Sequence, residues 1–249
     1  MYTWWVRRLL NEITNVTPLA VRQFFAGLQD RSPSLQHQAY RTLKTFFRWC
    51  AEAQVLVDTP LRGFTMRTPK TLPDVPSDDE LRRVLAACPE TLEGSRNRAL
   101  MLVMADSGLR ASEVLNLQIE DWRPLDRGLF VLGGKGRKDR VSFIGPTTIR
   151  ALKAWLAHHP APSPESYLFT DRHGRSLKRR HLVQILHRLS AKAGLSPARR
   201  LHPHALRHFA GTSWIRAGMG LDEVRRLLGH ESLTTTLRYS NLVGVDLQR

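Results

Sequence analysis

The sequence predicts a mainly α-helical protein with one small antiparallel β-sheet, divided into two domains. Apolar residues recur at helical spacing through most of the chain. Only two short runs, 128–132 and 140–144, resemble strands, and the glycine-bearing stretch GGKGRKD joins them as a hairpin turn would. Prolines from Pro60 to Pro76 interrupt the helical pattern and indicate an extended, basic linker between the two domains.

Residues 1–66 predict a small helical domain. Thr17 precedes Pro18 and Ser32 precedes Pro33, and in each pair an N-cap residue is followed by a proline suited to the first helical turn. The helix after Ser32 has an apolar i, i+4 pattern on one face and polar and basic residues on the other. The polar face suits contacts with phosphate, and an ordinary solvated helix face explains it equally well.

After a linker over 67–76, the chain predicts a larger domain over 77–249. Ser77 and Glu80 have the spacing of a capping box at its first helix. The helix over 96–107 is apolar on most sides, which indicates burial. Further helices are expected to start just after it at Ala111 and to span 147–158, 176–193, 203–217, 222–229 and 232–239.

The charge of the chain points to a polyanionic partner. Lys and Arg outnumber Asp and Glu enough to give a formal net charge of +16 and a sequence pI near 11.0. Such a surplus repels itself unless a polyanion offsets it, and nucleic acid is the usual one. A basic proteome or a membrane-surface protein is the plainer alternative. The 42% of hydrophobic residues is enough for a globular core rather than a disordered chain.

Cysteine usage and the absence of targeting signals predict a cytoplasmic protein. Cys50 and Cys88 both lie in apolar helical patterns, as reduced core residues do. No apolar run approaches the roughly 18 residues of a membrane-spanning helix. The N-terminal sequence MYTWWVRRLLNEIT has charges within its apolar pattern and no small-residue cleavage site, so a signal peptide is not expected.

Three charged residues in the larger domain fit a phosphate site, and each also has a plainer explanation. Arg110 lies where one expected helix ends and the next begins, and arginine binds phosphate bidentately at any working pH. Glu113 either orients Arg110 or a neighbouring base, or forms an ordinary salt bridge with it. Lys135, between two glycines, can reach a leaving oxygen as a general acid. An ordinary basic hairpin tip, with Arg140 among its neighbours, is the alternative.

A helix that begins at Pro203 places His204 in its first turn, with Arg207 three positions later on the same face. The N–H groups of a first turn also favour anions. His208, four positions after His204, suggests a metal pair at first sight. We predict no metal site, because the stretch has no HExxH pattern, no acidic third ligand and no cysteine cluster. We expect His208 to support Arg207 or the core.

His230 and Tyr239 close the set of candidate residues. His230 follows Leu-Leu-Gly at a predicted helix end, where a histidine often serves as a cap. Tyr239 lies in a mostly polar segment, and an exposed tyrosine usually has no special role. As a nucleophile it requires a nearby proton acceptor and cationic groups that stabilise the phenolate.

The order of these candidate residues along the chain resembles the pattern of the tyrosine recombinase (phage integrase) family, and of its Xer-type bacterial branch in particular. The resemblance covers about 77–240, while residues 1–66 match the family's DNA-clamping core-binding domain in position and character only. The motifs that carry it are SGLRASEVLNL (107–117), GGKGRKDR (133–140), HPHALRHFAGT (202–212) and LLGHESLTTTLRYS (227–240).

The resemblance implies a mechanism of DNA strand transfer. Tyr239 would attack a phosphodiester, forming a 3′-phosphotyrosyl link and releasing a 5′-hydroxyl. Arg110 and Arg207 would hold the non-bridging oxygens of the pentacoordinate transition state, where negative charge builds up. The covalent link stores the energy of the broken bond, so no ATP is expected. With the two arginines in place, no metal or other cofactor is expected either.

The remaining family positions concern hydrogen bonding and proton transfer. By the same resemblance, His230 would donate a hydrogen bond to the phosphate and His204 would help to accept the tyrosine proton. Lys135 would protonate the leaving 5′-oxygen, and Glu113 matches the acidic residue three positions after the first arginine.

The expected partner is double-stranded DNA at a recombination site, with self-association into a tetramer on DNA, with or without a second recombinase or an accessory protein, and no membrane. Nonspecific affinity should come from basic residues on phosphates. The candidates for DNA contact are Arg41, Lys44, Arg48, Lys178, Arg179 and Arg180.

Two other functions are compatible with parts of this pattern. A type IB topoisomerase-like enzyme uses nearly the same site without strand exchange. A DNA-binding protein that has lost catalysis has no reason to keep Tyr239 and Lys135. Two departures from the family bear on assembly: the chain starts within what would be the first clamp helix, and only ten residues follow Tyr239. Within those ten, Val243, Val245 and Leu247 can still form a short docking element. Integration, excision and dimer resolution all fit the pattern.

Overall fold

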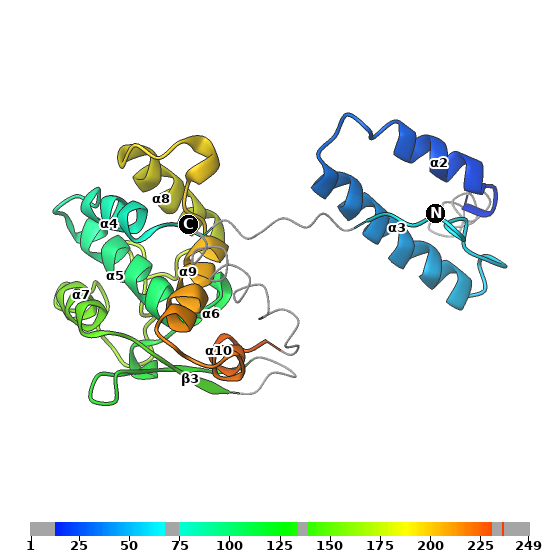
Figure 1. The fold of residues 1–249 in the computed structure, drawn as a ribbon. Coiled ribbons are helices and arrows are strands. Elements are labelled where there is room, and N and C mark those ends of the chain that lie inside the picture. Colours follow the sequence, from blue (N-terminus) through cyan, green and yellow to red (C-terminus); the bar gives the residue numbers. More distant parts are fainter. Residues whose placement is uncertain (1–12, 68–74, 134–138, 231–235, 237–249) are drawn as a thin grey trace. The chain divides into compact units, whose positions relative to one another are not determined.

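The computed structural model describes residues 13–67, 75–133, 139–230 and Thr236 (Figure 1). The predicted roles of Lys135 and Tyr239 and the expected helix over 232–239 therefore lie outside the described residues. Contacts between Cα atoms divide the chain into two compact units, Met1–Thr71 and Leu72–Arg249. The boundary between the units falls inside the stretch expected to be a linker.

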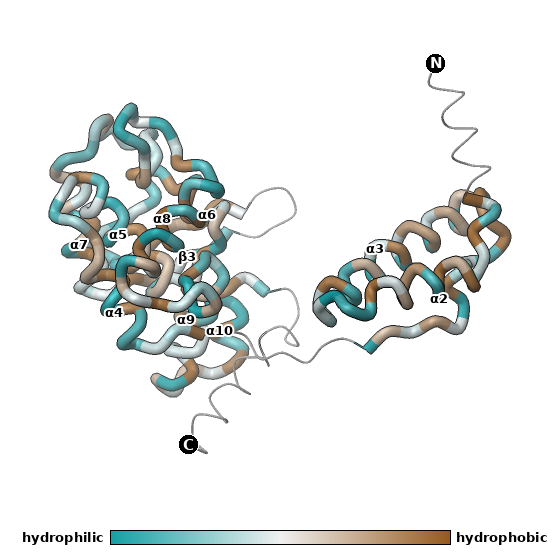
Figure 2. The backbone as a smooth tube through the Cα atoms, turned by 90° about the horizontal axis from the view of Figure 1, so that it is seen from above, coloured by the Kyte–Doolittle hydropathy of each residue, from teal (hydrophilic) through white to brown (hydrophobic). Residues whose placement is uncertain are grey.

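Among its described residues, the smaller unit includes the helices α2 (Pro18–Ala26) and α3 (Pro33–Glu52). Both begin as the sequence predicts: the Thr17 hydroxyl accepts a hydrogen bond from the amide of Ala20 at 3.1 Å, and the Ser32 hydroxyl accepts one from Leu35 at 3.3 Å. Hydrophobic and hydrophilic residues alternate along α3 (Figure 2), as expected of a helix with one buried face. The core residues of the unit are Val21, Phe25, Tyr40, Phe47 and Leu61.

The larger unit is built around one buried helix, α5 (Leu92–Ser107), which packs against α7 and α9. As predicted from its apolar sequence, α5 buries side chains on all sides. None of the helices in the described part of the chain is long and apolar enough to cross a membrane. The other helices among the described residues of this unit are α4 (Asp78–Ala86), α6 (Ala111–Asn116), α7 (Pro146–Leu156), α8 (Arg179–Lys192), α9 (Pro203–Arg216), α10 (Leu221–Leu228), and the short 3-10 helices η1 (Ile119–Asp121) and η2 (Pro197–Arg199).

Most predicted helix starts are confirmed, and two are corrected. The capping box at α4 is present, with Glu80 accepting from the amide of Ser77 at 2.8 Å. The helix expected from 96 begins earlier, because Thr91 caps it through a hydrogen bond from Gly94. The helix expected from 176 begins at Arg179 instead, since Ser176 pairs with Thr170 in an isolated β-bridge and the backbone there is extended.

The sheet has three antiparallel strands in the order β1 (Trp122–Arg123), β2 (Gly128–Val131) and β3 (Arg140–Phe143). The predicted hairpin of β2 and β3 is confirmed. The two residues of β1 are too few to produce a visible alternation in the sequence. Together the helices and the sheet confirm the predicted class, mainly α with a small antiparallel sheet.

The register of the hairpin decides which side chains of β3 point inward. Arg140 pairs with Val131 and Phe143 with Gly128, and the amide of Gly133 donates to the carboxylate of Asp139 at 2.8 Å, just beyond the paired residues. Ser142 is fully buried and its hydroxyl donates to the carbonyl of Ser107, at the end of α5, at 2.8 Å. Arg140, two residues earlier, therefore points to the same face of the sheet.

The two cysteines are buried free thiols, as the sequence predicts. Cys50 lies in the smaller unit on α3, and Cys88 follows α4. Burial raises the pKa of the Cys88 thiol, so this side chain packs as a small apolar group.

We expect Ser142→Ala to lower the free energy of unfolding by about 1–3 kcal/mol, because the buried carbonyl of Ser107 loses its donor. Urea unfolding followed by circular dichroism measures this change. The control Ser112→Ala removes an exposed hydroxyl from α6 and should change stability by less than about 0.5 kcal/mol. Equal unfolding midpoints for the two variants would show that the contact between β3 and α5 contributes nothing.

Candidate active site at the end of helix α10

Helix α10 ends in a turn that only glycine forms without strain. Gly229 has a φ of 62°, in the left-handed region. Its amide donates to the carbonyl of Arg226, and the amide of His230 donates to the carbonyl of Arg225, both at 3.0 Å. This pair of bonds is a Schellman motif. The turn leaves the next three carbonyls of the helix end, those of Leu227, Leu228 and Gly229, to find other donors.

Three arginines from three different elements donate to those carbonyls. The carbonyl of Leu227 accepts from Nε of Arg140 at 3.0 Å. The carbonyl of Leu228 accepts from Nη2 of Arg207 at 2.6 Å, and that of Gly229 accepts from Nη2 of Arg110 at 2.9 Å. Cations are favoured at a helix C-terminus because the aligned peptide dipoles leave it partially negative. The helix end thus gathers β3, α9 and the start of α6 around one point (Figure 1).

Arg110 and Glu113 form the pair that the sequence suggests. Arg110 is the N-cap of α6, and its amide donates to Oε2 of Glu113 at 2.8 Å. Its Nη1 donates to Oε1 of the same carboxylate at 2.9 Å. The two roles considered for Glu113, a salt bridge with Arg110 and the orientation of Arg110, are therefore compatible. The hydrogen bond that pairs the two charges also fixes the direction of the Arg110 guanidinium. The Arg110 side chain remains 27% exposed, so a ligand can reach it.

Arg140 belongs to the site, although the sequence indicates only that it begins the strand-like run 140–144 beside a basic hairpin tip. It lies in β3, with its side chain only 13% exposed, and forms a bidentate ion pair with Glu113. Nη2 lies 2.7 Å from Oε2 and Nη1 lies 3.2 Å from Oε1. The strand alternates Arg-Val-Ser-Phe, and apolar residues usually take the buried face. Here the polar residues point inward, and Phe143 is 55% exposed.

Glu113 stays ionised in this arrangement. Burial by itself would raise the pKa of Glu113, but the hydrogen bonds from Arg140 and from the Arg110 amide, with the charge of Arg140, outweigh it and lower the pKa to about 2. One carboxylate therefore lies among three guanidinium groups, and the cluster keeps a surplus of two positive charges. A surplus of this kind in a partly buried site attracts an anion such as phosphate.

Arg207 joins the ends of two helices. It is 4% exposed, and its Nη1 donates to the carbonyl of Gly108 at 2.7 Å while Nη2 reaches Leu228. Gly108 caps α5 in the left-handed conformation, with a φ of 60°. A Cβ atom at Gly108 would lie 2.8 Å from a methyl carbon of Leu228, so a side chain there would push the two helix ends apart.

His230 follows directly after this turn and is half-buried. Its Nδ1 lies 3.0 Å from the hydroxyl of Thr236. Burial, and then the charges of Arg207 and Arg110, lower the pKa of His230 to about 4. The imidazole is therefore neutral at pH 7, and it can donate one hydrogen bond and accept another.

His204 lies in the first turn of α9, which begins at Pro203 as predicted. Burial, and then the neighbouring His202, Arg207, Arg179 and Arg110, lower the pKa of His204 as well. A neutral imidazole beside cations can accept a proton from a reacting group. Within the described ranges, no three His, Cys, Asp or Glu side chains gather in a way that could hold a metal ion.

The structure thus brings together five of the residues singled out from the sequence, although they come from distant parts of the chain. Arg110, Glu113, Arg207 and His230 lie around the end of α10, and His204 is close enough to Arg110 and Arg207 for their charges to lower its pKa. Lys178, Arg179 and Arg180 lie at the start of α8, and Arg179 also acts electrostatically on His204.

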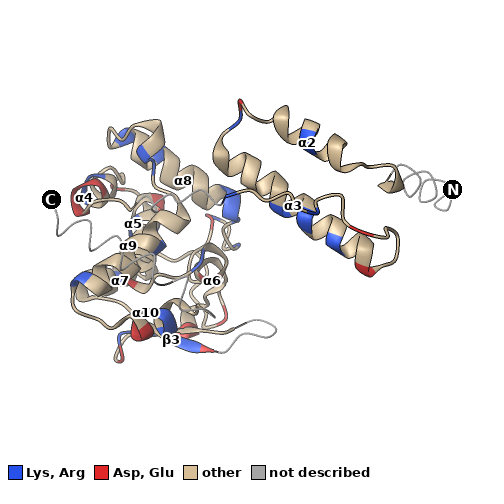
Figure 3. Cartoon of the chain, turned by 45° about the vertical axis from the view of Figure 1, so that its right-hand side comes forward, with Lys and Arg blue, Asp and Glu red and all other residues tan. Residues whose placement is uncertain are grey.

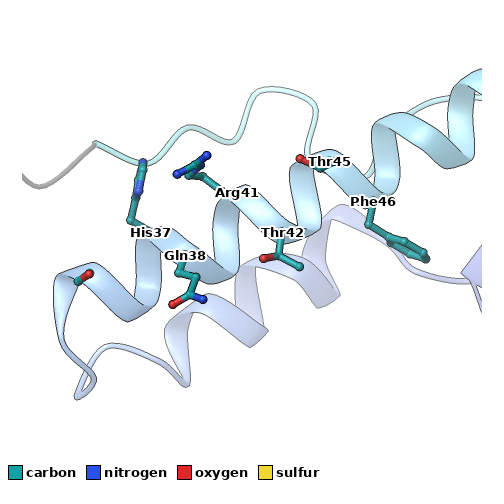
Figure 4. A pocket seen from close by; sticks show the side chains of 7 residues that line it. His37, Gln38, Arg41, Thr42, Thr45 and Phe46 are labelled. Atoms are coloured by element: carbon teal, nitrogen blue, oxygen red, sulfur yellow. The ribbon is translucent and has the colours of Figure 1, made fainter. Parts of the chain in front are cut away.

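The polar face that the sequence predicts in the smaller unit borders a hollow along α3 (Figure 4). His37, Gln38, Arg41, Thr42 and Thr45 line it with polar groups, and Phe46 lies at one end. A second hollow beside it is lined by residues that include Arg41, Lys44 and Arg48. The three basic residues proposed for DNA contact therefore line one hollow. Figure 3 shows Lys and Arg positions along α3 in blue.

The pKa values of His230 and Glu113 predict how stability depends on pH. Unfolding returns His230 to its ordinary pKa of 6.5, so the unfolded chain binds more protons between pH 4 and 6.5. Stability should rise across that window and then level off. Glu113 acts below it: its stabilisation is complete above pH 4.5 and is lost as pH falls toward 2. Urea unfolding at a series of pH values measures both effects.

In His230→Gln the rise between pH 4 and 6.5 should become shallower, while the loss below pH 4.5 persists. His187→Gln, at an exposed position on α8, is the matched control and should keep the wild-type rise. A wild-type slope in His230→Gln would mean that His230 is not the group that titrates.

Comparisons with known proteins give the family of the chain. A sequence model of the phage integrase family matches residues 76–243. The chain is 34% identical to tyrosine recombinase XerA of Thermococcus kodakarensis, over 100% of this chain and 86% of the relative. It is 32% identical to tyrosine recombinase XerC of Syntrophus aciditrophicus, over 91% of this chain and 76% of the relative.

Solved structures share the fold. A crystal structure of XerA recombinase has a TM-score of 0.63 and 26% identity, covering 99% of this chain and 90% of that one. The XerH recombinase bound to a palindromic difH substrate, in a post-cleavage complex, has a TM-score of 0.77 and 23% identity, covering 94% of this chain and 71% of that one. The chain belongs to the phage integrase family and is a Xer-type tyrosine recombinase, an enzyme that cleaves and rejoins DNA at specific sites.

Proposed function

We propose that Tyr239 of this recombinase attacks a DNA phosphate held by Arg110 and Arg207. The observation that carries the proposal is the convergence of both arginines and His230 on the end of α10. Tyr239 follows His230 by nine positions in the sequence. The fold fixes these guanidinium groups in place, and the cluster has a surplus of positive charge. The guanidinium groups can therefore stabilise the negative charge that develops on the phosphate oxygens without having to move during the reaction.

The histidines have complementary roles in this proposal. Nδ1 of the neutral His230 lies 3.0 Å from the Thr236 hydroxyl. We propose that Nδ1 accepts from this hydroxyl, which leaves the proton on Nε2, where it can be donated to a phosphate oxygen. His204, neutral and beside Arg207, helps to accept the phenol proton of Tyr239. Lys135 gives a proton to the 5′-oxygen as the bond to phosphorus breaks. The products are a 3′-phosphotyrosyl link and a 5′-hydroxyl, and attack by a 5′-hydroxyl on that link reforms the DNA strand and releases Tyr239.

DNA contact is proposed for one basic surface of each unit. In the smaller unit, Arg41, Lys44 and Arg48 lie along α3, beside side chains that can donate to or accept from phosphates and base edges. In the larger unit, Lys178, Arg179 and Arg180 lead into α8. The net charge of +16 supports DNA as the partner, and the similar recombinase XerH is bound to its difH substrate in a solved structure.

The smaller unit acts in this proposal as the DNA-clamping domain and the larger as the catalytic domain. Recombination needs strands from two duplexes, so we propose that the enzyme self-associates into a tetramer on its DNA site, with or without a second recombinase or an accessory protein. The family match does not favour a topoisomerase-like enzyme or a catalytically silent binder.

Covalent trapping tests the nucleophile. Purified protein is mixed with nicked duplexes that carry candidate sites from the DNA flanking its gene, then denatured and separated on a gel. The wild type should form a protein–DNA adduct, and Tyr239→Phe should form none while binding the same duplexes. Tyr167→Phe, at an exposed tyrosine of the larger unit, should form the adduct as the wild type does. An adduct in Tyr239→Phe would exclude that residue as the nucleophile.

Salt dependence tests the DNA surface of α3. Each phosphate contact that is lost should reduce the slope of log K against log salt by about one. Arg41→Gln and Lys44→Gln should each produce that reduction. Arg62→Gln removes an exposed arginine of the same unit that is paired with Asp58 at 2.7 Å, and it should leave the slope unchanged. Equal slopes in all three variants would place the DNA contacts elsewhere.

A further inference from the structure

We propose that Arg140 is a positioning residue of the recombination site, which offsets the charge of Glu113 and holds the end of α10 against β3. It deepens the proposed function, since it rests on Arg110 and Arg207 holding the phosphate. By this inference Arg140 itself does not contact DNA. Arg140 keeps Arg110 oriented, and it keeps the positive charge of Arg110 available to the phosphate.

The contacts and exposure of Arg140 differ from those of Arg110, with which it shares Glu113. Its Nη1 and Nη2 both face the carboxylate of Glu113, and its Nε faces the carbonyl of Leu227. Every one of these bonds is directed toward the protein. The side chain is 13% exposed, against 27% for Arg110. Arg140 is therefore placed to hold the site together, and Arg110 is placed to meet a ligand.

The charges explain why the site needs this residue. Glu113 orients Arg110 through two hydrogen bonds, but its carboxylate would also cancel the charge of Arg110 and repel a phosphate. The bidentate pair with Arg140 offsets that carboxylate. With Arg140 present, Glu113 can orient Arg110 while the three side chains together keep a net positive charge.

The packing around Gly229 is shaped to the same guanidinium. A Cβ atom at Gly229 would lie 3.3 Å from both Cζ and Nη1 of Arg140. Glycine is thus favoured here for two reasons, its positive φ and the close approach of this side chain. Through Arg140, β3 is held to the helix end that precedes His230.

Four variants test this inference: Arg140→Gln, Arg140→Lys, Glu113→Gln and the double variant Arg140→Gln/Glu113→Gln. The rate of adduct formation on nicked duplexes should fall by about a hundredfold in Arg140→Gln, because the reacting groups are misplaced, while DNA affinity changes little. Arg140→Lys restores the charge but not the bidentate geometry, and should recover part of the rate. Arg123→Gln removes a cation from the exposed face of the same sheet and should cleave as the wild type does.

The double variant separates the role in charge from a merely structural role. If Arg140 serves to offset Glu113, the double variant should cleave faster than Arg140→Gln alone, because no uncompensated carboxylate remains. A double variant no faster than Arg140→Gln overturns the inference, and so does an Arg140→Gln variant that cleaves at the wild-type rate.

A second readout is independent of cleavage. The charge of Arg140 is one of those that lower the pKa of His230, so an NMR titration of that imidazole should show a higher pKa in Arg140→Gln and a value near that of the wild type in Arg140→Lys. An unchanged pKa in Arg140→Gln would refute the placement of Arg140 in this site. If the wild type itself forms no Tyr239-dependent adduct, the proposed function fails, and the titration still decides the position of Arg140.

Discussion

The end of helix α10 is the constraint on which the larger unit and its site depend. Its Schellman turn leaves three carbonyls without helical partners, and guanidinium groups from α6, β3 and α9 supply the donors. Helix C-termini are usually capped by water or by local side chains, but here the donors come from positions far away in the chain. The same hydrogen bonds that complete a helix therefore assemble a cationic site from separate elements. The three arginines that cap the helix end are therefore also the cations of the site.

Electrostatic balance follows from that shared set. Three guanidinium groups in a partly buried cluster repel one another, and Glu113 at the start of α6 offsets part of this repulsion. The remaining surplus favours an anion, and burial together with these positive charges lowers the pKa of the nearby His204 and His230 and keeps both neutral. Neutral imidazoles beside fixed cations can exchange protons and donate hydrogen bonds at neutral pH, which acyl and phosphoryl transfer both require.

Sequence patterns predicted those parts of the fold and the site that depend on local chemistry. Caps such as Thr17 and Ser77, the start of α9 at Pro203 and the pair of Arg110 with Glu113 all involve residues within one helical turn. The role of Arg140 could not be predicted in this way. Its partner lies in another element, and its strand places polar residues inward, against the usual preference. Tertiary pairing overrode the local pattern there.

The hairpin register also limits how this gene can change by insertion and deletion. Arg140 and Ser142 both reach inward from β3, one to Glu113 and the other to the end of α5. A slip of one residue would turn both to the opposite face and expose their partners. The bond between Gly133 and Asp139 lies just outside the paired residues. The codons of β2 and β3 should therefore stay free of gaps among homologous genes.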